Sequence, residues 1–138
     1  MRQFVIDFGD RFREGSGLNR RVWIESELMG FLKRWGGPER EKPIFSNAPM
    51  ALAWHLGLDA RSSPNRKKCA SVIGKRAREC FLETTDPEFF GAYLLYFEEQ
   101  KYPYYYSFDE LAELAELTPV EVTSDGGVYE VSRRWPDD

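Results

Sequence analysis

The sequence has few of the residues that catalysis and metal binding most often use. Its 138 residues include one histidine, His55, and two cysteines, Cys69 and Cys80. One histidine among scattered carboxylates gives no cluster with metal-ligand spacing. Ser46 and His55 would lie at opposite ends of one short predicted helix, about 13 Å apart along its axis, which is too far for a catalytic pair. We therefore expect no catalytic residue, no metal and no cofactor in this chain.

The two cysteines are expected to be free thiols. The sequence predicts one helix over Arg66–Phe81, and the rise along a helix would separate Cys69 from Cys80 by about 16 Å. A disulfide needs Cα atoms about 5.5 Å apart. The same helix would carry a basic face that includes Lys75 and Arg78, either as a solvated surface or as a site for acidic headgroups.

Long apolar runs and an excess of basic charge are also absent. No apolar run approaches the roughly 18–20 residues that span a bilayer, and the N-terminus lacks the apolar block of a signal peptide. The sequence thus predicts a soluble chain that does not itself insert into a membrane. A formal net charge of −4 argues against a general nucleic-acid binder. No glycine-rich phosphate loop precedes a predicted helix, so no nucleotide site is expected.

What the sequence does contain is a globular composition rich in aromatic residues. Hydrophobic residues make up 42% of the chain and aromatic residues 15%. A chain of this length is typical of one domain with one core. We therefore predict a single domain over residues 1–138.

The segment 42–61, KPIFSNAPMALAWHLGLDAR, predicts one βαβ unit. A short buried strand is expected over Pro43–Ser46, followed by a helix with Asn47 as its N-cap and Pro49 in its first turn. Gly57 is expected to end that helix in the left-handed conformation. Leu58–Arg61 would then form the next strand, parallel to the first because a helix connects the two.

The remaining pattern completes the predicted fold. Helices are expected over Arg2–Arg13, along an apolar stripe at 24–35 with Ser26 or Asn19 as N-cap, and after Ser107, where Glu110 completes a capping box. The run Ala92–Phe97 shows no polar alternation, which predicts a central strand buried on both faces. Residues 119–132 alternate around a Ser-Asp-Gly-Gly turn, as a β-hairpin does. The order predicts a three-layer α/β/α domain whose mostly parallel sheet has an antiparallel C-terminal β-hairpin.

The first candidate site lies where the predicted parallel strands end. Ligands of such sheets bind beyond the carboxyl ends of the strands. Ser46 and Asn47 end the first strand, and Arg61 and Ser62 end the second, which together would suit an anion or a carboxylate. The alternative is that Ser46 and Asn47 only cap the helix and that Arg61 is a surface charge.

The second candidate site is a run of tyrosines. Tyr102, Tyr104, Tyr105 and Tyr106 follow the central strand. They would form either a stacking platform for a sugar or a partner protein, or part of the core with hydrogen-bonded hydroxyls.

Several motifs together suggest a known type of domain. They are GSGLNRRVWIES, PIFSNAPMALAWHLGLDAR, AYLLYFEE, SFDELAEL and SDGGVYEV, which span most of the chain from Gly15 to Val131. This set resembles the soluble C-terminal domain of polytopic bacterial membrane proteins similar to dolichyl-phosphate-mannose-dependent integral-membrane glycosyltransferases. The chain departs from that pattern at Phe45, where the family has tyrosine, and at Met50, where it has aspartate. Leu18 also replaces a tyrosine, and the glycine–arginine pair is separated here.

The resemblance implies a non-catalytic accessory domain on the extracytoplasmic side of a bacterial membrane. The catalytic centre would lie in a membrane part outside this chain, and the domain would contact a glycan or the parent protein. One alternative is a small stand-alone ligand-binding protein or enzyme, in the cytoplasm, that uses the strand ends near Ser46 and Asn47. Another is a protein–protein interaction module that uses the tyrosines.

Overall fold

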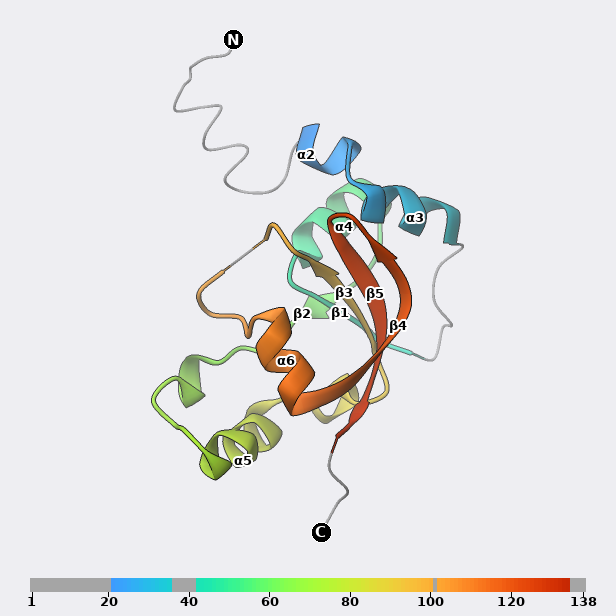
Figure 1. Cartoon of the computed structure of the whole chain (residues 1–138). Coiled ribbons are helices and arrows are strands. Elements are labelled where there is room, and N and C mark those ends of the chain that lie inside the picture. Colours follow the sequence, from blue (N-terminus) through green and yellow to red (C-terminus); the bar gives the residue numbers. More distant parts are fainter. Residues whose placement is uncertain (1–20, 36–41, 101, 135–138) are drawn as a thin grey trace, which may run out of the picture.

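A five-stranded mixed sheet organises the computed structural model, which describes residues 21–35, 42–100 and 102–134 (Figure 1). The strand order is β2-β1-β3-β5-β4. β1 pairs in parallel with β2 and with β3, whereas β5 is antiparallel to both β3 and β4. The mixed α/β fold is therefore confirmed, although parallel and antiparallel pairings are equally represented. The strands are β1 (Ile44–Ser46), β2 (Arg61–Ser62), β3 (Tyr93–Phe97), β4 (Ala115–Thr123) and β5 (Gly126–Arg133).

The described helices are short. The predicted helix Arg2–Arg13 lies outside the described residues. No helix in the described part of the chain has the length and apolar character needed to cross a membrane. The helices are α2 (Arg21–Ile24), α3 (Glu27–Trp35), α4 (Pro49–Leu56), α5 (Lys75–Thr84) and α6 (Phe108–Leu114), with 3₁₀ turns η1 (Lys67–Cys69) and η2 (Pro87–Phe89).

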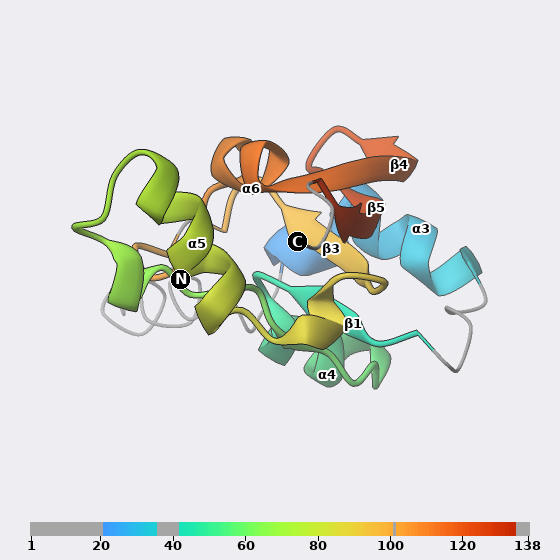
Figure 2. The ribbon, with the colours of Figure 1, turned by 90° about the horizontal axis from the view of Figure 1, so that it is seen from below.

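Two apolar clusters lie on the two faces of the sheet. Leu95 belongs to the cluster that includes residues of α3 and α4, and Leu94 to the cluster that includes residues of α5 and α6. Figure 2 shows α4 and α6 on opposite sides of β1 and β3. Successive strand residues point to opposite faces, and both leucines are completely buried. This explains why β3 shows no polar alternation, and it confirms the prediction of a central strand.

Strand β5 begins with a glycine because its backbone lies very close to β3. Gly126 pairs with Phe97. A Cβ atom at Gly126 would clash with the backbone oxygen of Tyr96. Any side chain there would force the two strands apart, so the β4–β5 connection depends on this glycine.

The start of α3 is tied to the β4–β5 turn through Asp125. The Ser26 hydroxyl accepts a hydrogen bond from the Met29 backbone N–H at 3.0 Å and donates to the Asp125 carboxylate. The Leu28 backbone N–H donates to the same carboxylate at 3.0 Å. Ser26, one of the two predicted candidates, is thus the N-cap. The apolar stripe was predicted to begin at Ile24, which is wrong, because a turn separates α2 from α3 and leaves Ile24 exposed.

Helix α4 ends as predicted and begins differently. Gly57 is left-handed, with φ of 65°, and its N–H donates to the Ala53 carbonyl. The N-cap is Ala48, which offers no side-chain bond, so the assignment of Asn47 as N-cap is wrong. The Ser46 hydroxyl instead accepts from the Ala48 N–H at 2.9 Å.

Helix α6 begins with the predicted capping box. The Glu110 backbone N–H donates to the Ser107 hydroxyl at 3.2 Å, and the Ser107 N–H donates to the Glu110 carboxylate at 2.8 Å. Ser107→Ala should lower the free energy of unfolding by about 1 kcal/mol, because one N–H at the helix start loses its acceptor. Urea denaturation measures this change. Ser132→Ala, at the exposed end of β5, should cost less than about 0.5 kcal/mol, and an equal loss in both variants would contradict the cap.

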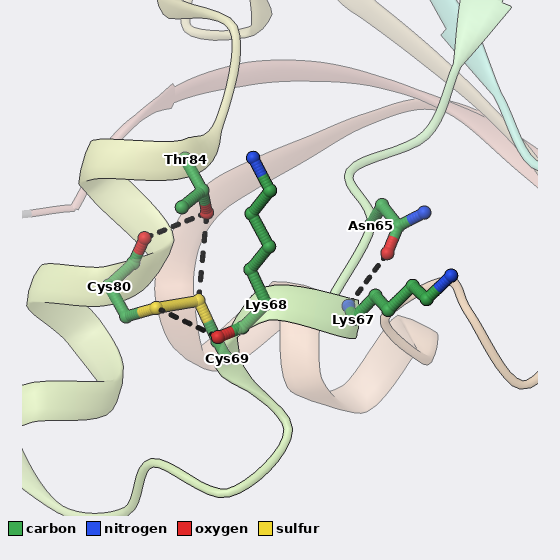
Figure 3. Close-up of a disulfide and its surroundings, with 6 residues drawn as sticks. All are labelled: Asn65, Lys67, Lys68, Cys69, Cys80 and Thr84. Atoms are coloured by element: carbon green, nitrogen blue, oxygen red, sulfur yellow. Dashed lines mark hydrogen bonds between the residues drawn. A yellow bond between two sulfur atoms is a disulfide. The ribbon is translucent and has the colours of Figure 1, made fainter.

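Cys69 and Cys80 form a disulfide, so the prediction of two free thiols is wrong (Figure 3). The predicted helix over Arg66–Phe81 is also wrong. Gly74 has φ of 69° and precedes the first residue of α5, so the chain turns back between η1 and α5. The Cα atoms of the two cysteines are consequently 6.0 Å apart. Because the helix is broken, Lys75 and Arg78 lie in α5, whereas Lys67 and Lys68 lie in the separate turn η1.

Candidate ligand-binding site

A hollow of about 570 Å³ lies beyond the carboxyl ends of the parallel strands. Residues that follow β1 form one wall, Ser62 at the end of β2 contributes to a second, and the tyrosine segment after β3 contributes to a third. This is the position at which sheets with parallel strands hold their ligands. The residues that line it are Trp23, Asn47, Ala48, Pro49, Met50, Ala51, Ala60, Ser62, Asn65, Tyr102, Tyr104 and Tyr105.

The hollow unites parts of the two candidate sites. Asn47 and Ser62 come from the strand-end site, and Tyr102, Tyr104 and Tyr105 come from the tyrosine site. The sequence placed these two groups separately because about forty residues lie between Ser62 and Tyr102. The structure brings them together at one edge of the sheet.

Backbone pairing with residues 64–66 fixes the tyrosine wall. The Arg66 N–H donates to the Tyr104 carbonyl at 2.8 Å, and the Tyr106 N–H donates to the Pro64 carbonyl at 3.3 Å. Asn65 and Tyr105 form an isolated antiparallel bridge between these bonds. Tyrosine rings carried on a segment held in this way are preorganised for contact with a ligand.

The tyrosine rings differ in their surroundings. Tyr102 and Tyr105 meet edge to face, with ring centroids 5.7 Å apart. Tyr104 is 56% exposed, and the Lys67 ammonium lies 5.3 Å from its ring centroid. Tyr106 is buried against Phe81 and does not line the hollow. The tyrosine run is thus divided between an exposed platform and the core.

Asn47 lines the hollow but is fully buried and has a structural role. Its amide group donates to the carbonyls of Phe97 and Gln100 at 2.7 and 2.8 Å. Its side-chain oxygen accepts from the Phe97 N–H at 2.8 Å. One side chain therefore binds the end of β3 to the end of β1, which sets the distance between two walls of the hollow.

Ser46 and Arg61 lie outside the hollow. Ser46 is completely buried, and its carbonyl accepts from the Ser63 N–H. Arg61 and Ser62 are adjacent in β2, so their side chains point to opposite faces of the sheet. The Arg61 guanidinium donates to Glu88 at 2.6 Å and to Asp86 at 3.1 Å, and the bond with Glu88 is the largest influence that raises its pKa. The basic side chain expected to hold an anion is thus paired with two carboxylates.

Trp23 is a residue of the site that sequence reasoning missed. It is only 3% exposed, and its ring packs edge to face against Phe97 with centroids 5.1 Å apart. Its indole N–H has no acceptor among the described residues. No local sequence signal marks it, because its place beside the hollow depends on how α2 packs against β3.

A second hollow of about 510 Å³ shares Tyr102 and Tyr105 with the first. It has an acidic lining, with Arg66 bonded to Glu110 at 3.0 Å. Burial is the main cause that raises the pKa of Tyr96, and the negative charges of the nearby carboxylates act in the same direction. The Tyr96 hydroxyl therefore remains neutral. The lining residues are Arg66, Tyr96, Glu98, Tyr102, Tyr105, Ser107, Phe108, Asp109 and Glu110.

The site is therefore a preorganised, aromatic hollow at the edge of a mixed α/β sheet, and none of its described lining residues is charged. No group of three or more histidine, cysteine or acidic side chains in the described ranges is placed to hold a metal ion. Comparisons with protein-family models, with curated proteins and with solved structures found no match for the chain.

Proposed function

We propose that the chain is a non-catalytic accessory domain of a membrane glycosyltransferase-like protein and that the hollow contacts a glycan. The observation that carries the proposal is the wall of Tyr102, Tyr104 and Tyr105 beside the amide of Asn65 and the hydroxyl of Ser62. Aromatic faces pack against the C–H faces of sugar rings, and hydroxyl and amide groups exchange hydrogen bonds with sugar hydroxyls. The proposal is also supported by the motifs at Lys42–Arg61 and in β5, which resemble those of the soluble C-terminal domains of such membrane proteins.

The lining of the hollow supports an accessory role over a catalytic one. Among its described lining residues there is no aspartate, glutamate, histidine, lysine or arginine, and these are the side chains that most often transfer protons. Met50 lies at the rim and is 67% exposed. It occupies the position at which the resembled family carries aspartate, so a carboxylate is missing there.

The disulfide supports an extracytoplasmic location. Disulfides persist in oxidising compartments and are rare in the bacterial cytoplasm. The Cys69–Cys80 bond connects η1 to α5. The Thr84 hydroxyl, which donates to the Cys80 carbonyl at 2.8 Å, packs beside it (Figure 3).

The finer architecture forms part of the same proposal. In it, the chain is a three-layer α/β/α domain with a C-terminal β-hairpin at the sheet edge. The two apolar clusters and the antiparallel β4–β5 pairing support that arrangement. The layer with α4 would carry the hollow.

The proposal also predicts that the gene encodes transmembrane helices upstream of Met1. A gene without membrane segments would contradict the parent assignment.

Tyr104→Ala should weaken glycan binding about tenfold, because one stacked aromatic contact contributes about 1–1.5 kcal/mol. Tyr104 is exposed, so its removal should leave the fold unchanged. Ligand-detected NMR titration with an oligosaccharide panel measures the affinity. Val122→Ala, an exposed apolar change on β4, should leave binding unchanged, and equal effects of the two substitutions would refute the tyrosine wall as the contact surface.

A further inference from the structure

We propose that the hollow selects an uncharged sugar ring, which the Trp23 indole N–H binds, and that it rejects anionic glycans. The proposal rests on the glycan contact proposed above and names the class of glycan. It departs from the anion site that the strand ends suggest in the sequence. Three separate observations carry it.

The first observation is that no described residue of the lining is charged. Charged residues make up 30% of the chain, yet none of the twelve lining residues that the structure describes carries a charge. The most obvious cationic candidate, Arg61, is paired with Asp86 and Glu88 on the other face of the sheet. A carboxylate or phosphate that entered the hollow would lose hydration and find no charged partner among the described lining residues. The Lys67 ammonium, 5.3 Å from the centroid of the Tyr104 ring, lies outside that lining.

The second observation is the indole N–H of Trp23. Its side chain lines the hollow, is 97% buried and has an N–H without an acceptor in the described part of the chain. A buried donor without a partner is unfavourable, and buried polar groups in native proteins are nearly always hydrogen-bonded. A hydroxyl or ring oxygen of a sugar is an acceptor of the right kind. Contacts with Phe97 and His55 position the ring, which lines this hollow and also a smaller hollow beside the start of α3.

The third observation is the acidic lining of the adjoining hollow. Tyr102 and Tyr105 belong to both hollows. The adjoining lining contains three carboxylates, from Glu98, Asp109 and Glu110, against the single guanidinium of Arg66. Glycans long enough to reach past the two tyrosines would therefore enter a negative field, which disfavours uronates and phosphates.

The test compares neutral hexose trisaccharides with the same trisaccharides oxidised to uronates at carbon 6. Isothermal titration calorimetry with the full chain should give at least tenfold weaker binding for each uronate. Trp23→Phe, which keeps an aromatic ring and removes the N–H, should weaken binding of the neutral ligand about tenfold. Trp54→Phe is the matched control, since Trp54 lies on α4, is 72% exposed and does not line the hollow.

The outcomes separate this proposal from the one on which it rests. Equal or tighter binding of the uronates, or unchanged binding by a folded Trp23→Phe variant, would overturn the selectivity and leave the glycan contact intact. Failure of every trisaccharide to bind the wild-type chain would overturn both. Circular dichroism and the urea midpoint of Trp23→Phe establish that it is folded. If it is not folded, Ser62→Ala replaces it, since Ser62 is an exposed residue that lines the same hollow. Ser62→Ala should weaken binding of the neutral ligand at least threefold, and unchanged binding would overturn the proposed ring site.

Discussion

Asn47→Ala should lower the free energy of unfolding by about 3–5 kcal/mol. The substitution removes three side-chain hydrogen bonds to the end of β3 and leaves the buried Phe97 N–H without its acceptor. Each buried polar group that loses its partner costs about 1–3 kcal/mol. Urea denaturation followed by circular dichroism measures the loss. A loss smaller than about 2 kcal/mol would contradict the buried role of Asn47.

Two further variants separate the buried role of Asn47 from a helix cap. Asn65→Ala removes an exposed side chain with one local bond, to the Lys67 N–H, and should cost less than about 1 kcal/mol. Asn47→Asp should be about as harmful as Asn47→Ala, because a carboxylate would face the carbonyls of Phe97 and Gln100. An N-cap position accepts aspartate as well as asparagine. A stable Asn47→Asp protein would therefore restore the cap interpretation.

Loss of the Cys69–Cys80 disulfide should lower the free energy of unfolding by about 3 kcal/mol. The bond closes a short loop, and the loop-entropy relation gives about that value for a loop of this size. Dithiothreitol should shift the urea midpoint of the wild-type protein, and the Cys69→Ser/Cys80→Ser double variant should unfold at the shifted midpoint. The reductant should have no effect on the double variant, which is the control.

Thiol counting gives an independent check on the bond. The protein denatured without reductant should show no reactive thiol, and after reduction it should show two. Two reactive thiols before reduction in protein prepared under oxidising conditions would exclude the disulfide. In that case the proposed extracytoplasmic location would lose the support of the disulfide, although the hollow and its tyrosines would not be affected.

Local signals in the sequence predicted the elements that depend on a few neighbouring residues. The Ser107–Glu110 capping box and the left-handed Gly57 are of this kind, because each needs contacts within one helical turn. The central position of β3 was also predictable, since a strand buried on both faces has no polar alternation. Gly74 lies inside the predicted helix, but the cost of a helical glycine relative to alanine is only about 1 kcal/mol, which is too small to predict that the helix breaks there.

The site depended on long-range packing and was predictable only in its parts. Asn47 was read as a local cap, whereas its partners Phe97 and Gln100 lie fifty residues away. The tyrosine wall takes its position from pairing with residues 64–66. The hydrophobic pattern of the sequence does not predict that pairing. Trp23 belongs to the site because of the way α2 packs against β3. The residue types of the candidate site could be read from the sequence, but the distances between them come from the fold.

The place of β3 in the sheet has a consequence for synthesis on the ribosome. Of the described strands, only β1 and β2 precede residue 90, and they are very short. β3 and its antiparallel partner β5 are close in sequence, because only α6 and β4 lie between them. Strand pairs of small sequence separation form faster than distant ones. We therefore expect the C-terminal third to fold first, with the apolar surfaces of α3 and α4 exposed until β3 has emerged.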